Sequence, residues 1–210
     1  AVRQAAEHAS VYMMPVQTIG CSQHHLSFGG TVSFRSSTYL DMLRDIGESL
    51  VIAGFKKIIF LNSHGGNDPL MTQTANDLAV AHPIWTASAA YWNIARDKLN
   101  ALNANEVGMV PGHAGGFETA AILAIKPELV RQDLISTTHI EREWLSAGKP
   151  RTFIGKHGEL TGYNGFTDAP HRATADKGQL YLDAIVDSVS DWLVQTVHAM
   201  DKGGDPCESD

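Results

Sequence analysis

The sequence predicts an α/β domain: a three-layer α/β/α arrangement in which helices cover both faces of a mainly parallel central sheet. Short apolar runs typical of buried strands alternate along the chain with longer segments of helical periodicity. The order strand, helix, strand, helix, strand, helix favours parallel strands joined by helical crossovers. The composition, with 43% hydrophobic and 19% charged residues, is that of an ordinary globular domain.

The first elements are a helix end and a strand. Residues 1–9 resemble the end of a helix, and residues 11–20 form an expected strand in which Pro15 indicates a bulge or an edge. Residues 21–34 contain several polar residues and glycines, so a loop is expected there.

A helix is expected over residues 36–54. Ser36 or Ser37 can cap its start, and Gly54 is a typical stop signal. Its apolar residues recur at the helical spacing and are Leu40, Leu43, Ile46 and Leu50.

The middle of the chain predicts a strand, a helix and a second strand. Residues 56–62 form a short apolar run, and residues 84–92 form another. Between them lies a helix for which Asn67 stands at the cap position and Pro69 in the first turn.

The last third predicts two helices separated by loops. One opens near residues 113–125 and ends before Pro127, after a looser stretch over residues 93–112. Residues 131–171 show little periodicity and are expected to be mostly loop. The final helix, about residues 172–200, places apolar side chains on one side, namely Leu182, Ile185, Val186, Val189 and Leu193.

The length and the charge of the chain limit the functions that it can have. A chain of 210 residues suits a single domain, expected over residues 1–200, with a disordered tail over 201–210. The formal charge of -7 argues against nucleic acid as a partner. No apolar stretch approaches the roughly 18 residues that span a bilayer, so no membrane partner is expected. Two distant cysteines favour a cytoplasmic location over a disulfide framework.

The stretch "FLNSHGGNDPL" places His64 at the end of a predicted strand, where ligands bind in such sheets. Gly65 and Gly66 remove side chains that would block close approach to the backbone, and Asn67 follows at the helix cap. The stretch therefore predicts a site residue at His64, although a simple turn would use the same residues.

A second motif, "PGHAGGFETA", carries His113 and Glu118. Five residues apart on one helix, they would point roughly 140° from each other. We therefore expect His113 in a loop and Glu118 in the first helical turn, where the helix dipole favours a carboxylate. Gly115 and Gly116 form the backbone of this loop. An ionised carboxylate together with imidazoles is a ligand set for divalent metals.

These two motifs, with "GCSQHHLSFGGTVSF" and "GYNGFTDAPHRATADKG", resemble the creatininase family of metal-dependent amidohydrolases over nearly the whole chain. The resemblance implies a three-layer α/β fold, a hexamer, and two divalent ions (Zn, Mn or Fe) at the strand ends. It implies hydrolysis of a C–N bond in a small molecule, such as an amide, a cyclic amide or a formamide.

The resemblance also implies roles for individual residues. His64 and Glu118 match metal ligands, and His113 matches the histidine to which proton transfer is ascribed. Tyr91 and Trp92 fall where relatives place pocket residues, and His25 is also expected to bind substrate.

The sequence departs from the family in several places. Many relatives carry glutamate where Gly116 stands, creatininase has one where Gly66 stands, and Gly29 replaces a common proline. His24 stands where many relatives have glutamate before the histidine that matches His25.

The amino-terminal family motif that supplies a Glu, a His and an Asp to the metals is absent, as is the strand expected with it. We therefore expect these 210 residues to bind metal weakly and to turn over poorly. Two alternatives remain: hydrolysis of a C–C bond in a sugar-derived ketone, and a non-catalytic family member that has lost its metal site. A nucleotide-binding protein is disfavoured because the phosphate-binding glycine motifs are missing.

Overall fold

The structure is a computed structural model that describes residues 1–137, 154–156 and 164–204. These residues belong to two compact units. Unit 1 is built from three segments of the chain: Ala1–Leu26, Gly30–Arg96 and Ile185–Asp210. Unit 2 is built from the remaining two: Ser27–Gly29 and Asp97–Ala184.

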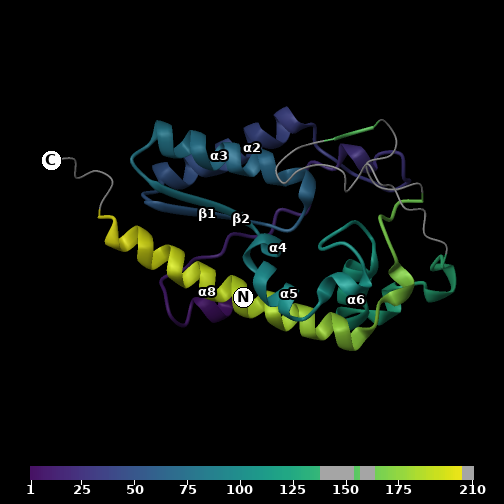
Figure 1. Cartoon of the computed structure of the whole chain (residues 1–210). Helices are drawn as coiled ribbons and strands as arrows, with labels where there is room; N and C mark the ends of the chain where they lie inside the picture. The colour runs from purple at the N-terminus through teal and green to yellow at the C-terminus, as the bar shows by residue number, and fades with distance from the viewer. Residues whose placement is uncertain (138–153, 157–163, 205–210) are drawn as a thin grey trace. The chain divides into compact units, whose positions relative to one another are not determined.

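A parallel sheet lies at the centre of unit 1. Strand β1 (Lys57–Asn62) pairs with strand β2 (Trp85–Ala90) in parallel, from Lys57 opposite Trp85 to Asn62 opposite Ala90. Helices α2 (Ser36–Ile52) and α3 (Asp68–Ala81) lie together on one face of this sheet (Figure 1). Because α3 connects the two strands, the predicted crossover is confirmed.

Successive residues of β1 pack on opposite faces of the sheet, as the period of a strand requires. Ile58 lies in a core cluster with Leu78 of α3 and Ile84. Its neighbour Ile59 packs against the cluster of Ala5, Val189 and Leu193 on the other side. The strand is therefore covered on both faces, and the α/β/α layering predicted from the sequence is confirmed within unit 1.

Residues 11–20 are not a strand, which corrects the sequence-based expectation. In the described residues the sheet consists of β1 and β2, and residues 11–20 have no ladder partner. Most of their large apolar side chains are exposed, with Tyr12 at 85% and Val16 at 76%. Without a neighbouring strand or a helix over them these side chains gain nothing from a pleated conformation, because β-propensity acts through such packing.

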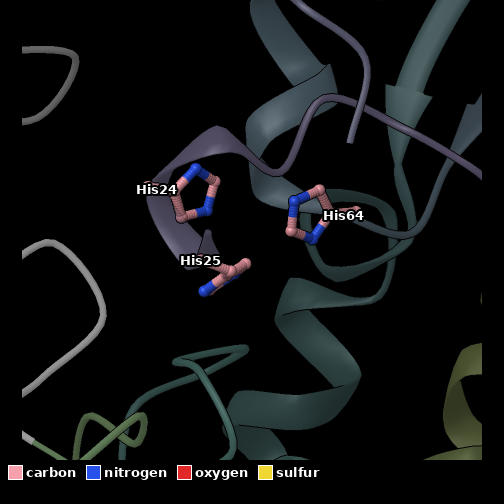
Figure 2. A group of neighbouring side chains, drawn as sticks. All are labelled: His24, His25 and His64. Carbon is pink, nitrogen blue, oxygen red and sulfur yellow. The ribbon is translucent and has the colours of Figure 1, made fainter. Parts of the chain in front are cut away.

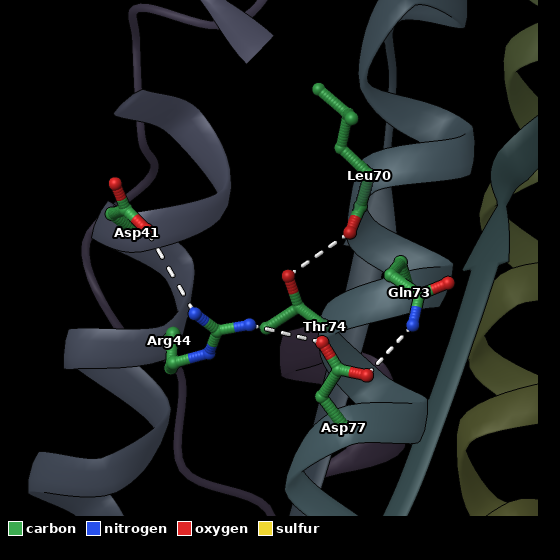
Figure 3. A network of polar contacts seen from close by, with 6 residues as sticks. All are labelled: Asp41, Arg44, Leu70, Gln73, Thr74 and Asp77. Carbon is green, nitrogen blue, oxygen red and sulfur yellow. Dashed lines mark hydrogen bonds and ion pairs between the residues drawn. The ribbon is translucent and has the colours of Figure 1, made fainter. Parts of the chain in front are cut away.

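Close contacts hold α2 against α3. A Cβ on Gly47 would lie 2.3 Å from Cδ1 of Leu78, so the absence of a side chain lets the two helices approach. At the surface, Arg44 of α2 bonds Asp77 of α3 at 3.1 Å (Figure 3). This exposed pair adds little stability, and it marks turns of the two helices that face each other.

The helix boundaries follow the expected signals with small differences. Helix α2 begins at Ser36 itself, with Arg35 at the cap position and no capping side chain. Gly54 then adopts φ +92, which explains why the helix stops at Ile52. Asn67 is the N-cap of α3 as predicted.

Unit 2 is built from short helices around α6 (Gly116–Ile125). Its core contains Phe117, whose ring stacks on Tyr181 with centroids 5.3 Å apart. The other short elements are the helix α5 (Arg96–Ala101) and the 3-10 turns η3 (Ala104–Val107), η4 (Pro127–Leu129), η5 (Gln132–Leu134) and η6 (Pro170–Arg172).

The last helix, α8 (Ala175–Lys202), starts later and ends later than expected. Val189 and Leu193 are buried as predicted, whereas Val186 is 37% exposed and is not on the buried side. Much of the loop expected over residues 131–171, and residues 205–210 of the expected tail, lie outside the described residues. No helix in the described part of the chain combines the length and the apolar character needed to cross a membrane.

Candidate metal centre

The turn after β1 holds His64 by its backbone. Asn62, the last residue of the strand, is 3% exposed. Its Oδ1 accepts a hydrogen bond from the His64 N–H at 3.0 Å, and its Nδ2 donates to the His64 carbonyl at 2.9 Å. Both polar backbone groups of His64 are therefore paired with one buried side chain. The following residues form the 3-10 turn η2 (Gly65–Asn67), which leads into α3.

Two further histidines lie against His64. His24 and His25 belong to the short 3-10 turn η1 (Gln23–His25). The His24 ring is stacked parallel to the His64 ring with centroids 5.5 Å apart, and the His25 ring lies 5.6 Å from His64 and 4.1 Å from His24. One ring nitrogen from each histidine lies within 4.8 Å of the others (Figure 2). All three side chains are partly buried.

Polar contacts fix the segment that carries the two adjacent histidines. Ser22 Oγ lies 3.0 Å from Nε2 of His64, and the Ser22 N–H donates to Ser33 Oγ at 2.7 Å. Thr31 Oγ1 donates to the His25 carbonyl at 2.9 Å. The loop from Ser22 to Ser33 is thereby closed on itself and tied to the turn after β1.

Gly66 is required for this close approach. A Cβ at position 66 would lie 2.1 Å from the backbone oxygen of Cys21, 2.9 Å from Cε1 of His24 and 3.0 Å from Nε2 of His64. The first of these contacts is with backbone, which cannot move aside cheaply. The predicted role of Gly66 in close backbone approach therefore has a structural basis, whereas a Cβ on Gly65 would meet open space.

Burial favours the neutral form of these imidazoles. The pKa of His24 is lowered by burial and then by the nearby His64. Burial also lowers the pKa of His64, against the opposing effect of a hydrogen bond to the Cys21 backbone. Burial thus favours the uncharged form of both rings, which carries a nitrogen lone pair and is the form that coordinates metal. Three imidazole side chains are a typical ligand set for a zinc-class ion.

The second predicted motif lies in unit 2 and has the expected local geometry. His113 lies in the loop before α6, and Glu118 lies in the first turn of that helix. The Ala114 N–H donates to Glu118 Oε2 at 2.7 Å. Thr167 links to His113 on both sides: its Oγ1 accepts from the His113 N–H at 2.8 Å, and its own N–H donates to the His113 carbonyl at 2.8 Å.

The pKa of Glu118 is raised. Burial is the main cause, the hydrogen bond from the Ala114 backbone opposes it, and the charge of Asp168 adds to it. The carboxylate is thus held in an environment that disfavours its charge, and a cation would relieve this cost.

Asp168 organises the loop before α6. It is 6% exposed and accepts hydrogen bonds from the N–H groups of Met109, Gly116 and Ala169 at 3.0, 2.8 and 2.7 Å. A Cβ on Gly115 would lie 2.2 Å from its Oδ1. The glycines of this motif therefore make room for a buried carboxylate that holds the loop backbone.

The aromatic pair predicted to bind substrate packs together. Tyr91 and Trp92 lie at the start of the short helix α4 (Tyr91–Ile94), with ring centroids 5.1 Å apart and an edge-to-face angle of 83°. Tyr91 also packs against the cluster of Ala5, Val189 and Leu193. This contact gives Tyr91 a packing role, and substrate binding by the pair stays a prediction.

The sequence does not predict three residues of these sites. By sequence alone His24 is a departure from the family pattern, Asn62 is the end of a strand, and Asp168 is part of a longer motif. A usable signal exists for His24, because two adjacent histidines in a Gly-flanked loop are uncommon. The bonds from Met109 and Gly116 to Asp168 join residues 59 and 52 positions apart, which local patterns do not reveal.

The chain is similar to known proteins over most of its length. A family model described as creatinine amidohydrolase matches residues 1–193. A creatinine amidohydrolase of Pseudomonas putida is 23% identical over 204 residues, which cover 90% of this chain and 76% of that protein. A mycofactocin precursor peptide peptidase of Mycobacterium ulcerans (strain Agy99) is 27% identical over 126 residues, 59% of this chain and 43% of that protein.

Solved structures share the fold. A mutant creatininase in complex with creatine aligns with a TM-score of 0.70 at 22% identity, covering 91% of this chain and 79% of that chain. A mutant creatininase described as Zn-Zn type aligns with a TM-score of 0.71 at 22% identity, covering 91% and 78%. Because the family model matches more than nine-tenths of the sequence, the chain belongs to the creatininase family of amidohydrolases.

Proposed function

We propose that this protein is a metal-dependent hydrolase of a C–N bond in a small molecule. The observation that carries the proposal is the match of residues 1–193 to the creatinine amidohydrolase family. The imidazoles gathered around His64 support the dependence on a metal, because neutral histidines are common ligands of catalytic ions. Zinc and manganese are both candidates, since solved creatininases are described with each.

Each candidate residue has a separate task in this proposal. His64 holds the ion, and Asn62 keeps the His64 backbone in place. Glu118 is proposed as a carboxylate ligand, as the family resemblance implies. A divalent ion held by these residues would supply a water molecule of lowered pKa, near about 7, and a Lewis acid for the substrate carbonyl.

His113 is proposed to deliver a proton to the departing nitrogen. An imidazole suits this step because it can carry and release a proton near neutral pH. Thr167 positions His113 by bonding both its N–H and its carbonyl. The ring is thus attached to a loop backbone that is held on both sides.

The substrate is proposed to be a small amide, a cyclic amide or a formamide. One relative is named for creatinine and another for a precursor peptide, so both cyclic amides and short peptides belong among the compounds tested. Binding of substrate by Tyr91 and Trp92 is a proposal as well. So are a second ion and assembly into a hexamer, which the family resemblance supports, and a cytoplasmic location, which the two distant cysteines favour.

The test is a hydrolysis assay with the 210-residue chain, made metal-free with a chelator and then loaded with zinc or manganese. Creatinine, other cyclic amides, formamides and short peptides are offered as substrates. We expect metal-dependent release of product from at least one, with losses of about 100-fold or more in His113→Ala. Hydrolysis that persists in the presence of the chelator would contradict the proposed metal dependence. Hydrolysis that is unchanged in His113→Ala would contradict the proposed role of His113.

A further inference from the structure

We infer that His24, His25 and His64 form a three-imidazole binding site for a zinc-class divalent ion, with no carboxylate among these three ligands. The inference deepens the metal dependence proposed above, but it rests only on contacts within unit 1. It assigns His24 a ligand role and changes the role expected for His25 from substrate binding to metal binding.

The distances allow coordination after a small adjustment. A four-coordinate zinc ion with Zn–N bonds of about 2.0–2.1 Å places its ligand nitrogens about 3.3 Å apart and the ring centroids about 5 Å apart. The three ring nitrogens lie within 4.8 Å of one another, and the centroids are 4.1 to 5.6 Å apart. The nitrogens must therefore move together by no more than about 1.5 Å, which side-chain rotation alone can achieve.

The backbone around the three histidines is built to hold them. Asn62 bonds both backbone groups of His64, and Thr31 bonds the carbonyl of His25. The N–H of Cys21 donates to Asn67 Oδ1 at 2.8 Å, which joins the two segments of chain that supply the ligands. A site whose ligands are already positioned loses less entropy when an ion binds.

The ring of His24 lies where a side chain at position 66 would collide with it. Its Cε1 lies 2.9 Å from the Cβ that Gly66 lacks, and Nε2 of His64 lies 3.0 Å from the same point. The absence of a side chain at position 66 therefore leaves room for the rings of His24 and His64. Figure 2 shows these two rings together with the ring of His25. Both ring nitrogens of His25 are shielded from solvent.

The ligand type predicts the metal. Imidazole nitrogens suit Zn²⁺, Co²⁺, Ni²⁺ and Cu²⁺, whereas Mn²⁺ and Mg²⁺ prefer carboxylate, carbonyl and water oxygens. A site of three imidazoles should therefore bind zinc at least about 100-fold more tightly than manganese, in keeping with the general order of affinities. This selectivity goes beyond the metal dependence that the family implies.

The experiment is a metal titration of the full chain after chelation, followed by calorimetry with zinc and manganese and by visible absorption with cobalt. The absence of the amino-terminal family motif predicts weak metal binding, whereas the three-imidazole site predicts one tight zinc per chain and the intense cobalt spectrum of a four-coordinate complex. His24→Ala and His25→Ala should each weaken zinc binding by more than about 100-fold, beyond the 10–100-fold effect of residues that only support ligands. His8→Ala and His198→Ala, which change exposed histidines of the same unit, should bind zinc as the wild type does.

A second variant keeps the inference testable if removal of a histidine unfolds the chain. His24→Glu keeps a ligand but replaces nitrogen by oxygen, so zinc should still bind while the preference over manganese narrows by about tenfold or more. Circular dichroism of each metal-free variant checks that it is folded. An unchanged zinc-to-manganese ratio in His24→Glu, or wild-type zinc affinity in folded His24→Ala and His25→Ala, would overturn the inference.

The outcomes also separate this inference from the proposed activity. Zinc binding that needs all three histidines, without hydrolysis of any substrate, contradicts only the proposed function. Metal-dependent hydrolysis with unchanged zinc affinity in His24→Ala contradicts only the three-imidazole site.

Discussion

The N–H of Cys21 donates a hydrogen bond to Oδ1 of Asn67 across 46 positions of sequence, at 2.8 Å. Asn67 occupies the N-cap position of α3, yet its side chain makes no capping bond. It connects the start of that helix to the segment that leads into His24 and His25. One amide side chain therefore fixes the separation of the two chain segments that carry the candidate ligands.

Asn67→Ala should weaken zinc binding more than it weakens the fold. Loss of the bond frees the segment before His24, so we expect zinc affinity to fall by about 10–100-fold, as for other residues that orient ligands. The free energy of unfolding should drop by only about 1 kcal/mol. Calorimetry and urea unfolding of the metal-free chain measure the two effects. Asn76→Ala, on the exposed side of α3, is the matched control and should change neither.

Two adjacent glycines should respond differently to a methyl group. Gly66→Ala places a Cβ against the Cys21 carbonyl and between two histidine rings, so we expect a loss of about 1–3 kcal/mol in unfolding free energy and weaker zinc binding. Gly65→Ala meets open space and should stay within about 0.5 kcal/mol. Thermal melts and zinc titrations of the two variants check this difference, and equal effects would refute the close approach at position 66.

Asp168→Ala should strongly destabilise the chain. The substitution leaves three backbone N–H groups without their acceptor, and each such loss in a buried place costs about 1–3 kcal/mol. We therefore expect a loss of about 3 kcal/mol or more by urea unfolding. Asp183→Ala removes an exposed carboxylate that accepts a hydrogen bond from Gln179 one helical turn away, and it should cost less than about 0.5 kcal/mol. A loss for Asp168→Ala no larger than that of its control would show that this carboxylate does not organise the loop.

The local parts of the fold and of the candidate site could be predicted from the sequence. The apolar run of β1, the position of His64 after it, Asn67 at the cap and Glu118 in the first turn of α6 all follow from short patterns. These features depend on contacts among neighbours in the chain, which periodicity and turn chemistry capture.

The remaining features depend on contacts between distant segments. The pairing of His24 and His25 with His64 joins residues about 40 positions apart, and no periodic pattern marks it. Residues 11–20 have the composition of a strand, but a strand also needs a partner, and composition does not show whether one is present.

Glu118→Gln should abolish hydrolysis without destabilising the metal-free chain at neutral pH. The pKa of Glu118 is raised above its ordinary value of 4.5, mainly by burial. Its contribution to stability is therefore greatest when it is protonated and declines as the pH rises through the raised pKa. A neutral glutamine avoids that decline, so the variant should be as stable as the wild type at pH 7, or more stable. Urea unfolding with a chelator, compared with the hydrolysis assay, tests this; a large loss of stability at pH 7 would contradict it.

The metal-free chain should lose stability in mild acid. The pKa values of His24 and His64 lie below the ordinary value of 6.5, mainly through burial. The unfolded chain then binds protons at a higher pH than the folded chain. The contribution of these two histidines to the free energy of unfolding is therefore complete above pH 6.5, and it is lost as the pH falls through the lowered pKa values. Urea unfolding between about pH 5 and pH 8 measures how the free energy of unfolding changes with pH. His24→Gln should reduce this change, whereas His8→Gln should leave it as in the wild type.

X-ray absorption spectroscopy of the zinc-loaded chain tests the three-imidazole site most directly, because it reads the identity and distance of the ligands themselves. The account predicts three imidazole nitrogens at about 2.0–2.1 Å from zinc, and two in His24→Ala. A zinc ion surrounded by oxygen, or one whose imidazole count is the same in the wild type and in His24→Ala, would contradict it.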